Sequence, residues 1–102
     1  MEKVAVVTGT SSGIGFETAL ALAREGCYTY ATMRDTTKGD KLRELASKEN
    51  LKIDVLELDV DSEDSAKTAI KHILDQKQRI DVLVNNAGWG LWGCVEDVSV
   101  DE

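Results

Sequence analysis

The sequence predicts an α/β fold of the Rossmann type, in which helices cover both faces of a doubly wound parallel sheet. Two observations predict it. Short apolar runs alternate with helical stretches along the chain, and a glycine-rich turn directly follows the first run. Such alternation favours right-handed crossovers between parallel strands. We expect one partial dinucleotide-binding domain over residues 1–102, with strand order 3-2-1-4. It would be the N-terminal half of such a fold, truncated before strands 5–7.

Four short apolar runs predict the strands, at residues 4–7, 28–33, 53–58 and 80–84. The first run is continuously apolar, as expected for a strand covered on both faces. The second is rich in aromatic and β-branched residues, which favour strands. The fourth run would become an edge of the sheet, so we expect it to recruit another strand.

Three stretches predict helices, at residues 13–25, at 38–48 and from Ser62 onward. Gly26 suits the position just past the end of the first helix. In the third, Ser62 is a good N-cap, and the two acidic residues after it suit the positive end of the helix dipole. Its apolar residues fall on one face and are Ala66, Ala69, Ile70, Ile73 and Leu74. A further helix would begin near Ser99.

Composition excludes several functional classes. The formal net charge of −7 argues against a general nucleic-acid surface, which needs clustered Lys and Arg. No apolar run approaches the ~20 residues that cross a bilayer, and no signal peptide is recognisable, so we expect a cytoplasmic protein. Cys27 and Cys94 lack metal-ligand spacing and are expected to be reduced thiols.

The glycine-rich turn has a physical purpose. Glycines let the backbone turn sharply and approach a pyrophosphate, and the free N–H groups that open the next helix bind the anion. The residues from Thr8 to Gly15 read Thr-Gly-Thr-Ser-Ser-Gly-Ile-Gly, in the strand-turn-helix context that this role requires. Taken alone, the motif could also be an ordinary glycine-rich turn.

The turn resembles the cofactor motif of short-chain dehydrogenases/reductases, and two further motifs agree with it. Asp59-Val60 follows the third strand, where the family uses an acid for the adenine amino group and the next backbone for the ring. Asn85-Asn86-Ala87-Gly88 follows the fourth, where the family's similar motif stabilises the sheet and lies along the ribose. Singly, Asp59 could be a cap and the asparagines only turn formers. The resemblance implies cofactor-binding roles for Gly9, Ser11, Ser12, Gly13, Ile14, Gly15, Arg34, Asp59, Val60, Asn86, Ala87 and Gly88.

The end of the second strand bears on the choice of dinucleotide. An acid there accepts from a ribose 2′-hydroxyl, whereas an arginine pairs with a 2′-phosphate. By spacing, Asp35 would be the acid of an NAD site. In the family comparison, however, Met33 stands where NAD-preferring members place their acid, and Arg34 where NADP-preferring members place their base. Ser12 also resembles a position that helps to hold the phosphate. NADP(H) is therefore favoured over NAD(H); otherwise Arg34 is a solvated cation, with Lys38 and Lys41 merely nearby.

The resemblance implies that the parent protein interconverts alcohols and carbonyls by hydride transfer, using a Tyr-x-x-x-Lys pair. Tyr28 and Tyr30 are the only tyrosines, and neither has a lysine four residues later, so we expect no catalytic residue and no turnover in these 102 residues. His72 is expected to be solvated. The binding partner would be a small alcohol or carbonyl, and the native state a homo-oligomer.

Two further features concern the substrate and the alternatives. The stretch from Ala31 to Asp35 and the loop from Gly90 to Gly93 resemble members that act on steroids or retinoids, which points to a lipophilic substrate. Trp89 and Trp92 would line its mouth or pack against the missing half. Two other functions stay open: an inactive dinucleotide-binding module, and an assembly fragment that pairs with another chain.

Overall fold

Four parallel strands form one sheet in the order β3-β2-β1-β4. The computed structural model describes residues 2–86; residues 1 and 87–102, which include the helix expected near Ser99, lie outside the description. The strands are β1 (Val4–Val7), β2 (Tyr28–Met33), β3 (Ile53–Glu57) and β4 (Val82–Val84). The helices are α1 (Gly13–Arg24), the short 3₁₀ helix η1 (Thr36–Gly39), α2 (Asp40–Glu49) and α3 (Glu63–Lys77). The predicted strand order and fold class are confirmed.

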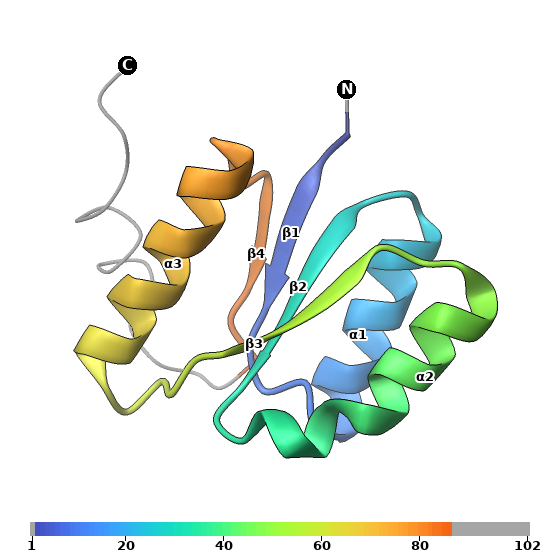
Figure 1. Ribbon diagram of the computed structural model, residues 1–102, viewed down its shortest axis with the longest axis horizontal. Coiled ribbons are helices and arrows are strands. Elements are labelled where there is room, and N and C mark those ends of the chain that lie inside the picture. The colour runs from blue at the N-terminus through green and yellow to red at the C-terminus, as the bar shows by residue number, and fades with distance from the viewer. Residues whose placement is uncertain (1, 87–102) are drawn as a thin grey trace.

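Helices cover both faces of the sheet, with α1 and α2 on one side and α3 on the other (Figure 1). Alternation along β1 explains this arrangement, because successive side chains of a strand point to opposite faces. Val6 packs in a cluster with Tyr30 and Ile73, on the α3 side. Val7 packs in a cluster with Leu20 and Leu42, on the α1 and α2 side. The continuous apolar run of β1 is therefore buried on both faces, as its sequence predicts.

The helix that was expected over residues 38–48 is divided into η1 and α2. Asp35 is the N-cap of η1, and its side chain accepts a hydrogen bond from the Thr37 backbone N–H at 3.0 Å. The chain therefore makes a tight 3₁₀ turn before the α-helix begins at Asp40. The spacing of Asp35 suits a cofactor residue as well as a cap, so the prediction missed this turn.

The other boundaries differ by only one or two residues. Glu25 caps α1 and Gly26 follows it with φ of 99°, a left-handed conformation that glycine adopts at no steric cost. The fourth strand begins at Val82 instead of residue 80. Asp81 leads into it by donating its backbone N–H to Val4 O at 2.8 Å while its carboxylate accepts from Val4 N at 2.7 Å. In the described part of the chain, no helix has the length and apolar character to cross a membrane.

Candidate functional site

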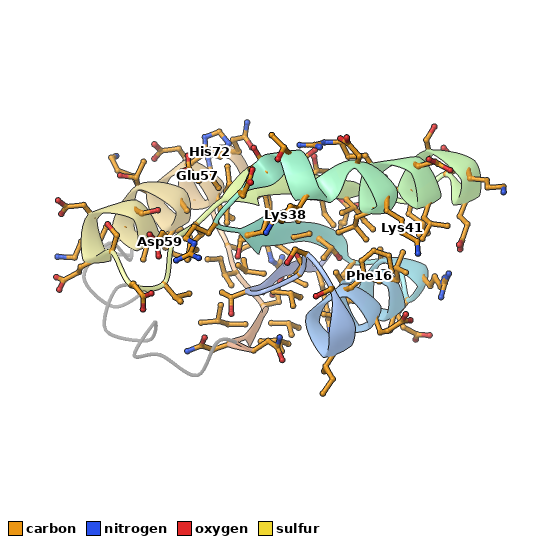
Figure 2. All side chains as sticks on the ribbon, turned by 90° about the horizontal axis from the view of Figure 1, so that it is seen from below. Phe16, Lys38, Lys41, Glu57, Asp59 and His72 are labelled. Carbon is orange, nitrogen blue, oxygen red and sulfur yellow. The ribbon has the colours of Figure 1, made fainter. Side chains whose placement is uncertain are left out.

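The glycine turn links β1 to α1 at the carboxyl ends of the strands, the edge that Figure 2 views. Gly9 and Gly13 have φ values of 66° and 65°, which lie in the left-handed region that favours glycine. A Cβ added to Gly13 would meet no atom within 4 Å, so the backbone there faces open space. The turn thus exposes bare backbone at Gly13.

Hydrogen bonds fix this turn to the two strands that flank β1. The backbone N–H and the Oγ1 hydroxyl of buried Thr10 both donate to Thr32 O on β2, at 3.2 and 3.0 Å. On the other side, the Thr8 backbone N–H donates to Val84 O on β4 at 3.0 Å. Asn86 then donates its Nδ2 to Gly9 O at 3.3 Å. The ends of three strands therefore form one connected edge.

Gly15 allows the turn to approach α1 closely. A Cβ on this buried residue would lie 2.1 Å from Gly9 O and 3.0 Å from Asn86 Nδ2. Glycine is therefore needed at position 15 for packing, whereas at Gly13 it is needed for the backbone conformation.

The N-terminus of α1 is prepared for an anion from outside the helix. Its N-cap, Ser12, makes no side-chain capping hydrogen bond, and the first turn contains no acidic residue. In α3, by contrast, Ser62 accepts from Ser65 N and two acidic residues occupy the first turn. The opening N–H groups of a helix need an acceptor, and the dipole favours a negative one. A phosphate beside Ser12 would supply it.

The end of β2 separates two roles that the sequence left open. Asp35 accepts from both the hydroxyl and the backbone N–H of Thr37, which lowers the pKa of its carboxyl, with a smaller contribution from Lys38. Arg34 is exposed, and within residues 2–86 it forms no hydrogen bond or ion pair. Both bonds from Thr37 end on Oδ1 of Asp35, so the acid holds η1 through one oxygen, and the Arg34 guanidinium next to it is unpaired within residues 2–86.

At the end of β3, Asp59 has a structural role as well. Its Oδ1 accepts from Asp61 N at 2.9 Å, and its own backbone N–H donates to Ser65 Oγ at 2.9 Å. Val60 packs against the cluster formed by Leu58, Ala66 and Ala69. Asp59 therefore does cap a turn, the alternative that the sequence allowed, and it stands at the strand edge that carries the glycine turn (Figure 2). Ala87 and Gly88 lie outside the described residues, as do Trp89, Trp92 and Cys94.

Two hollows adjoin the glycine turn. One, of about 550 Å³, is bordered by Gly13, Ile14 and Ala21, and Ile14 is 76% exposed. The other, of about 240 Å³, is lined by Ser11, Ser12, Gly13, Phe16, Glu17 and Lys41. Sequence reasoning treated Lys41 only as a nearby cation. The available signal was its place in the first turn of the helix that comes shortly after Arg34 in the sequence.

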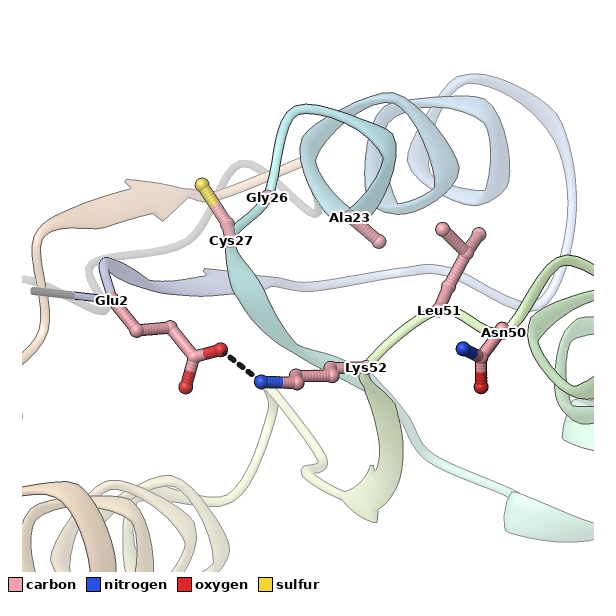
Figure 3. Close-up of a pocket in the computed structure, with 7 residues that line it drawn as sticks. All are labelled: Glu2, Ala23, Gly26, Cys27, Asn50, Leu51 and Lys52. Carbon is pink, nitrogen blue, oxygen red and sulfur yellow. Dashed lines mark hydrogen bonds and ion pairs between the residues drawn. The ribbon is translucent and has the colours of Figure 1, made fainter.

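A third cavity, of about 220 Å³, lies at the opposite end of the strands and has a different character (Figure 3). It is bordered by the buried free thiol of Cys27 and by the ion pair between Glu2 and Lys52 at 2.7 Å. Glycine turn residues take no part in it, so it does not belong to the candidate site.

The tyrosines and the histidine offer no acid–base centre at the strand edge. Tyr28 donates its hydroxyl to Asp54 at 2.6 Å, a bond that raises the pKa of the phenol. Tyr30 donates to Gln76 at 2.8 Å, and burial raises its pKa as well. His72 lies exposed on α3, as expected. Both hydroxyls are therefore already bonded to protein groups, and the imidazole lies on the surface of α3.

Comparison with known proteins agrees with this geometry. Residues 3–102 match the family model of short chain dehydrogenases. A short-chain dehydrogenase/reductase of Penicillium roqueforti is 44% identical over 101 residues, which cover 98% of this chain and 28% of that protein. An uncharacterized oxidoreductase of Bacillus subtilis is 41% identical over 102 residues, covering 98% of this chain and 36% of its own. The chain thus spans about a third of the length of the curated relatives it matches.

Solved structures of known proteins also resemble this chain. A metagenomic short-chain oxidoreductase in complex with NADP superposes with a TM-score of 0.80 at 34% identity, over 86% of this chain and 40% of that one. A variant of actinorhodin polyketide ketoreductase with NADPH gives 0.77 at 28% identity, over 92% and 40% of the two chains. On the family model and these relatives, the chain belongs to the short-chain dehydrogenase/reductase family.

Proposed function

We propose that this chain is the NADP(H)-binding part of a short-chain oxidoreductase that interconverts alcohols and carbonyls. The observation that carries the proposal is the N-terminus of α1, which has neither a capping side chain nor an acid in its first turn and adjoins the open face of Gly13. The pyrophosphate would lie against these N–H groups, with Gly9, Ser11, Ile14 and Gly15 shaping the turn.

The same edge has suitable partners for the rest of the dinucleotide. Asp59 would accept from the adenine amino group through the carboxylate oxygen that Asp61 does not use, and the Val60 backbone would contact the ring. The strand that ends at Asn86 would lie along the ribose, together with Ala87 and Gly88. Asn86 fits this role because its amide already holds Gly9 O beside the turn.

Preference for NADP(H) over NAD(H) rests on Arg34 and Asp35. A 2′-phosphate is a dianion, and an exposed guanidinium without another partner in residues 2–86 can meet it with a charge-assisted bond. Asp35, the acid that would select NAD, already holds the hydroxyl and the backbone N–H of Thr37 with its Oδ1. The two solved relatives described with NADP and NADPH support this choice.

When bound, the nicotinamide would supply the hydride for reduction of a carbonyl. The chain's own residues would bind and orient the cofactor. The sequence contains no Tyr-x-x-x-Lys, and both tyrosine hydroxyls are engaged on β2, so we propose that these 102 residues alone have no turnover. Spectrophotometry of NADPH with aldehydes, ketones and quinones tests this. Saturable oxidation that co-purifies with the chain would contradict it.

A lipophilic substrate is proposed for the parent protein. Mouse retinol dehydrogenase 12 is 36% identical over 88 residues, and a 3-ketodihydrosphingosine reductase of Bacteroides thetaiotaomicron is 34% identical over 101 residues. Both names describe long apolar substrates, in agreement with the resemblance seen in the sequence.

Substitution of Arg34 tests the cofactor assignment. Arg34→Ala should weaken NADP⁺ binding about tenfold or more, because a hydrogen bond to a charged group contributes about 1.5–3 kcal/mol. NAD⁺ lacks the 2′-phosphate, so its affinity should change little. Calorimetric titration of both dinucleotides measures the ratio, and retained NAD⁺ affinity shows that the variant is folded. Equal losses for both, or no binding of either by the folded wild-type chain, would refute the proposal.

A further inference from the structure

The cavity of about 240 Å³ beside the glycine turn joins two separate elements. Ser11, Ser12 and Gly13 line it from the turn, and Lys41 lines it from the first turn of α2. A group that extends from a ligand on the turn into this cavity would therefore meet Lys41.

In the described part of the chain, the surroundings of Lys41 position its side chain without pairing its charge. Its Nζ lies 5.8 Å from the centre of the Phe16 ring, a cation–π distance, and Figure 2 shows the side chain pointing toward that ring. Within residues 2–86 it forms no ion pair, whereas Arg43 on the same helix pairs with Asp40 at 3.1 Å. An aromatic ring can position an ammonium group without neutralising it. The Lys41 ammonium is therefore unpaired within residues 2–86 and lines the cavity beside Ser12.

The other charged group that lines this cavity is Glu17. It approaches from α1 and opposes an anion, so the proposal has to hold against it. Lys38 stands on η1, where it makes a small contribution to the lowered pKa of Asp35, and Arg34 directly follows β2. Within the cavity lining Lys41 and Glu17 carry opposite charges, so a phosphate there would also need a cation from outside the lining, for which Arg34 is the candidate.

We propose that Lys41 is a second specificity-determining residue, which contacts the 2′-phosphate of NADP(H) from α2 while Arg34 contacts it from β2. This inference rests on the proposed function. Two cations that approach from different elements suit a dianion with three terminal oxygens, since one guanidinium satisfies only part of it. Ser12 lines the same cavity as Lys41 and would donate its hydroxyl, which makes no capping hydrogen bond.

Three variants that each remove one positive charge test the inference, together with Glu17→Gln and Lys41→Arg. Lys41→Gln and Arg34→Gln alter the two proposed contacts, and Lys48→Gln is the matched control. Lys48 is also exposed on α2, at the other end of the helix, and has no ion pair in residues 2–86. Calorimetry with NADP⁺ and NAD⁺ and a thermal melt of each variant are the measurements.

We expect Lys41→Gln to weaken NADP⁺ binding about fivefold and Arg34→Gln about tenfold or more, with NAD⁺ affinity retained in both. The effect of Lys41→Gln should shrink as salt rises, because the ammonium is exposed. Glu17→Gln should tighten NADP⁺ binding, because it removes the negative charge that lines the cavity. Lys41→Arg should retain the NADP⁺ affinity of the wild-type chain, and Lys48→Gln should leave both affinities unchanged.

The outcomes separate the inference from the proposed function. If Arg34→Gln is selective but Lys41→Gln alters neither affinity, or both equally, the inference is overturned and the NADP(H) site stands. If Lys48→Gln matches Lys41→Gln, the effect is one of overall charge and the inference is again overturned. If Arg34→Gln weakens NADP⁺ and NAD⁺ binding equally, or the folded wild-type chain binds neither dinucleotide, the proposed function fails.

Discussion

Gly15→Ala is the most direct test of how the turn is built. Helix propensity alone predicts that alanine in α1 stabilises the chain by up to about 1 kcal/mol. The structure predicts the opposite sign, because the new Cβ would lie 2.1 Å from Gly9 O, where ordinary contact begins at 3.4 Å. The obstacle is backbone, and Gly9 is also held by Asn86, so neither partner yields easily.

Overpacking of this kind costs about 1–3 kcal/mol and sometimes more, so we expect a net loss near the upper end of that range. For a domain of this size, the melting temperature should fall by roughly 10 °C or more. Urea unfolding followed by circular dichroism measures the free energy, and calorimetry measures dinucleotide affinity. Gly13→Ala is the matched control: it meets no atom within 4 Å, and only its left-handed φ of 65° should cost about 1 kcal/mol. A Gly15→Ala chain as stable as wild type would refute this packing argument.

Three more predictions concern stability and association. Thr10→Val should cost about 1 kcal/mol in urea unfolding, because Thr32 O loses one of its two donors; no change would show that the backbone bond suffices. Arg79 and the Val4 N–H lower the pKa of Asp81 in the folded chain, so its stabilisation is present above the unfolded pKa of about 4 and disappears as pH falls through the lower folded value. Asp81→Asn should therefore flatten the pH dependence of the melting temperature below about pH 4, and an unchanged slope would contradict this. Val82→Lys should reduce self-association through the β4 edge in light scattering over a concentration series, whereas a wild-type chain that stays monomeric would argue against such pairing.

Much of the fold was predictable because its local signals agree with one another. The limits of β2 match the prediction, and the Ser62 cap and the buried face of α3 are as expected. At each of these places the local sequence pattern is enough to predict the local structure. The 3₁₀ turn before α2 was missed because Asp35 was considered only as the alternative acid of an NAD site, and its capping of η1 was not considered.

The left-handed ends of two helices were not predictable in the same way. Asn50 and Gln78 close α2 and α3 with φ of 57° and 61°, although neither is glycine. Local backbone hydrogen bonds close these helix ends, as where Leu51 N donates to Ala46 O at 2.8 Å, but outside glycine the residue type alone indicates such an end only weakly. The cavity at Lys41 was not predictable either, because it forms only where α1 and α2 lie side by side.

Structural and ligand roles at this edge do not exclude each other. Asn86 shows why: its amide fixes Gly9 O, and that carbonyl is the atom that makes glycine obligatory at position 15. If Asn86 only ended a turn, its contact with a residue 77 positions earlier would be unnecessary. The contact instead holds the first and fourth strand ends at a fixed spacing, which a ligand that spans both would require. Capping at Asp59 acts in the same sense, since it immobilises a carboxylate whose second oxygen accepts no hydrogen bond within residues 2–86.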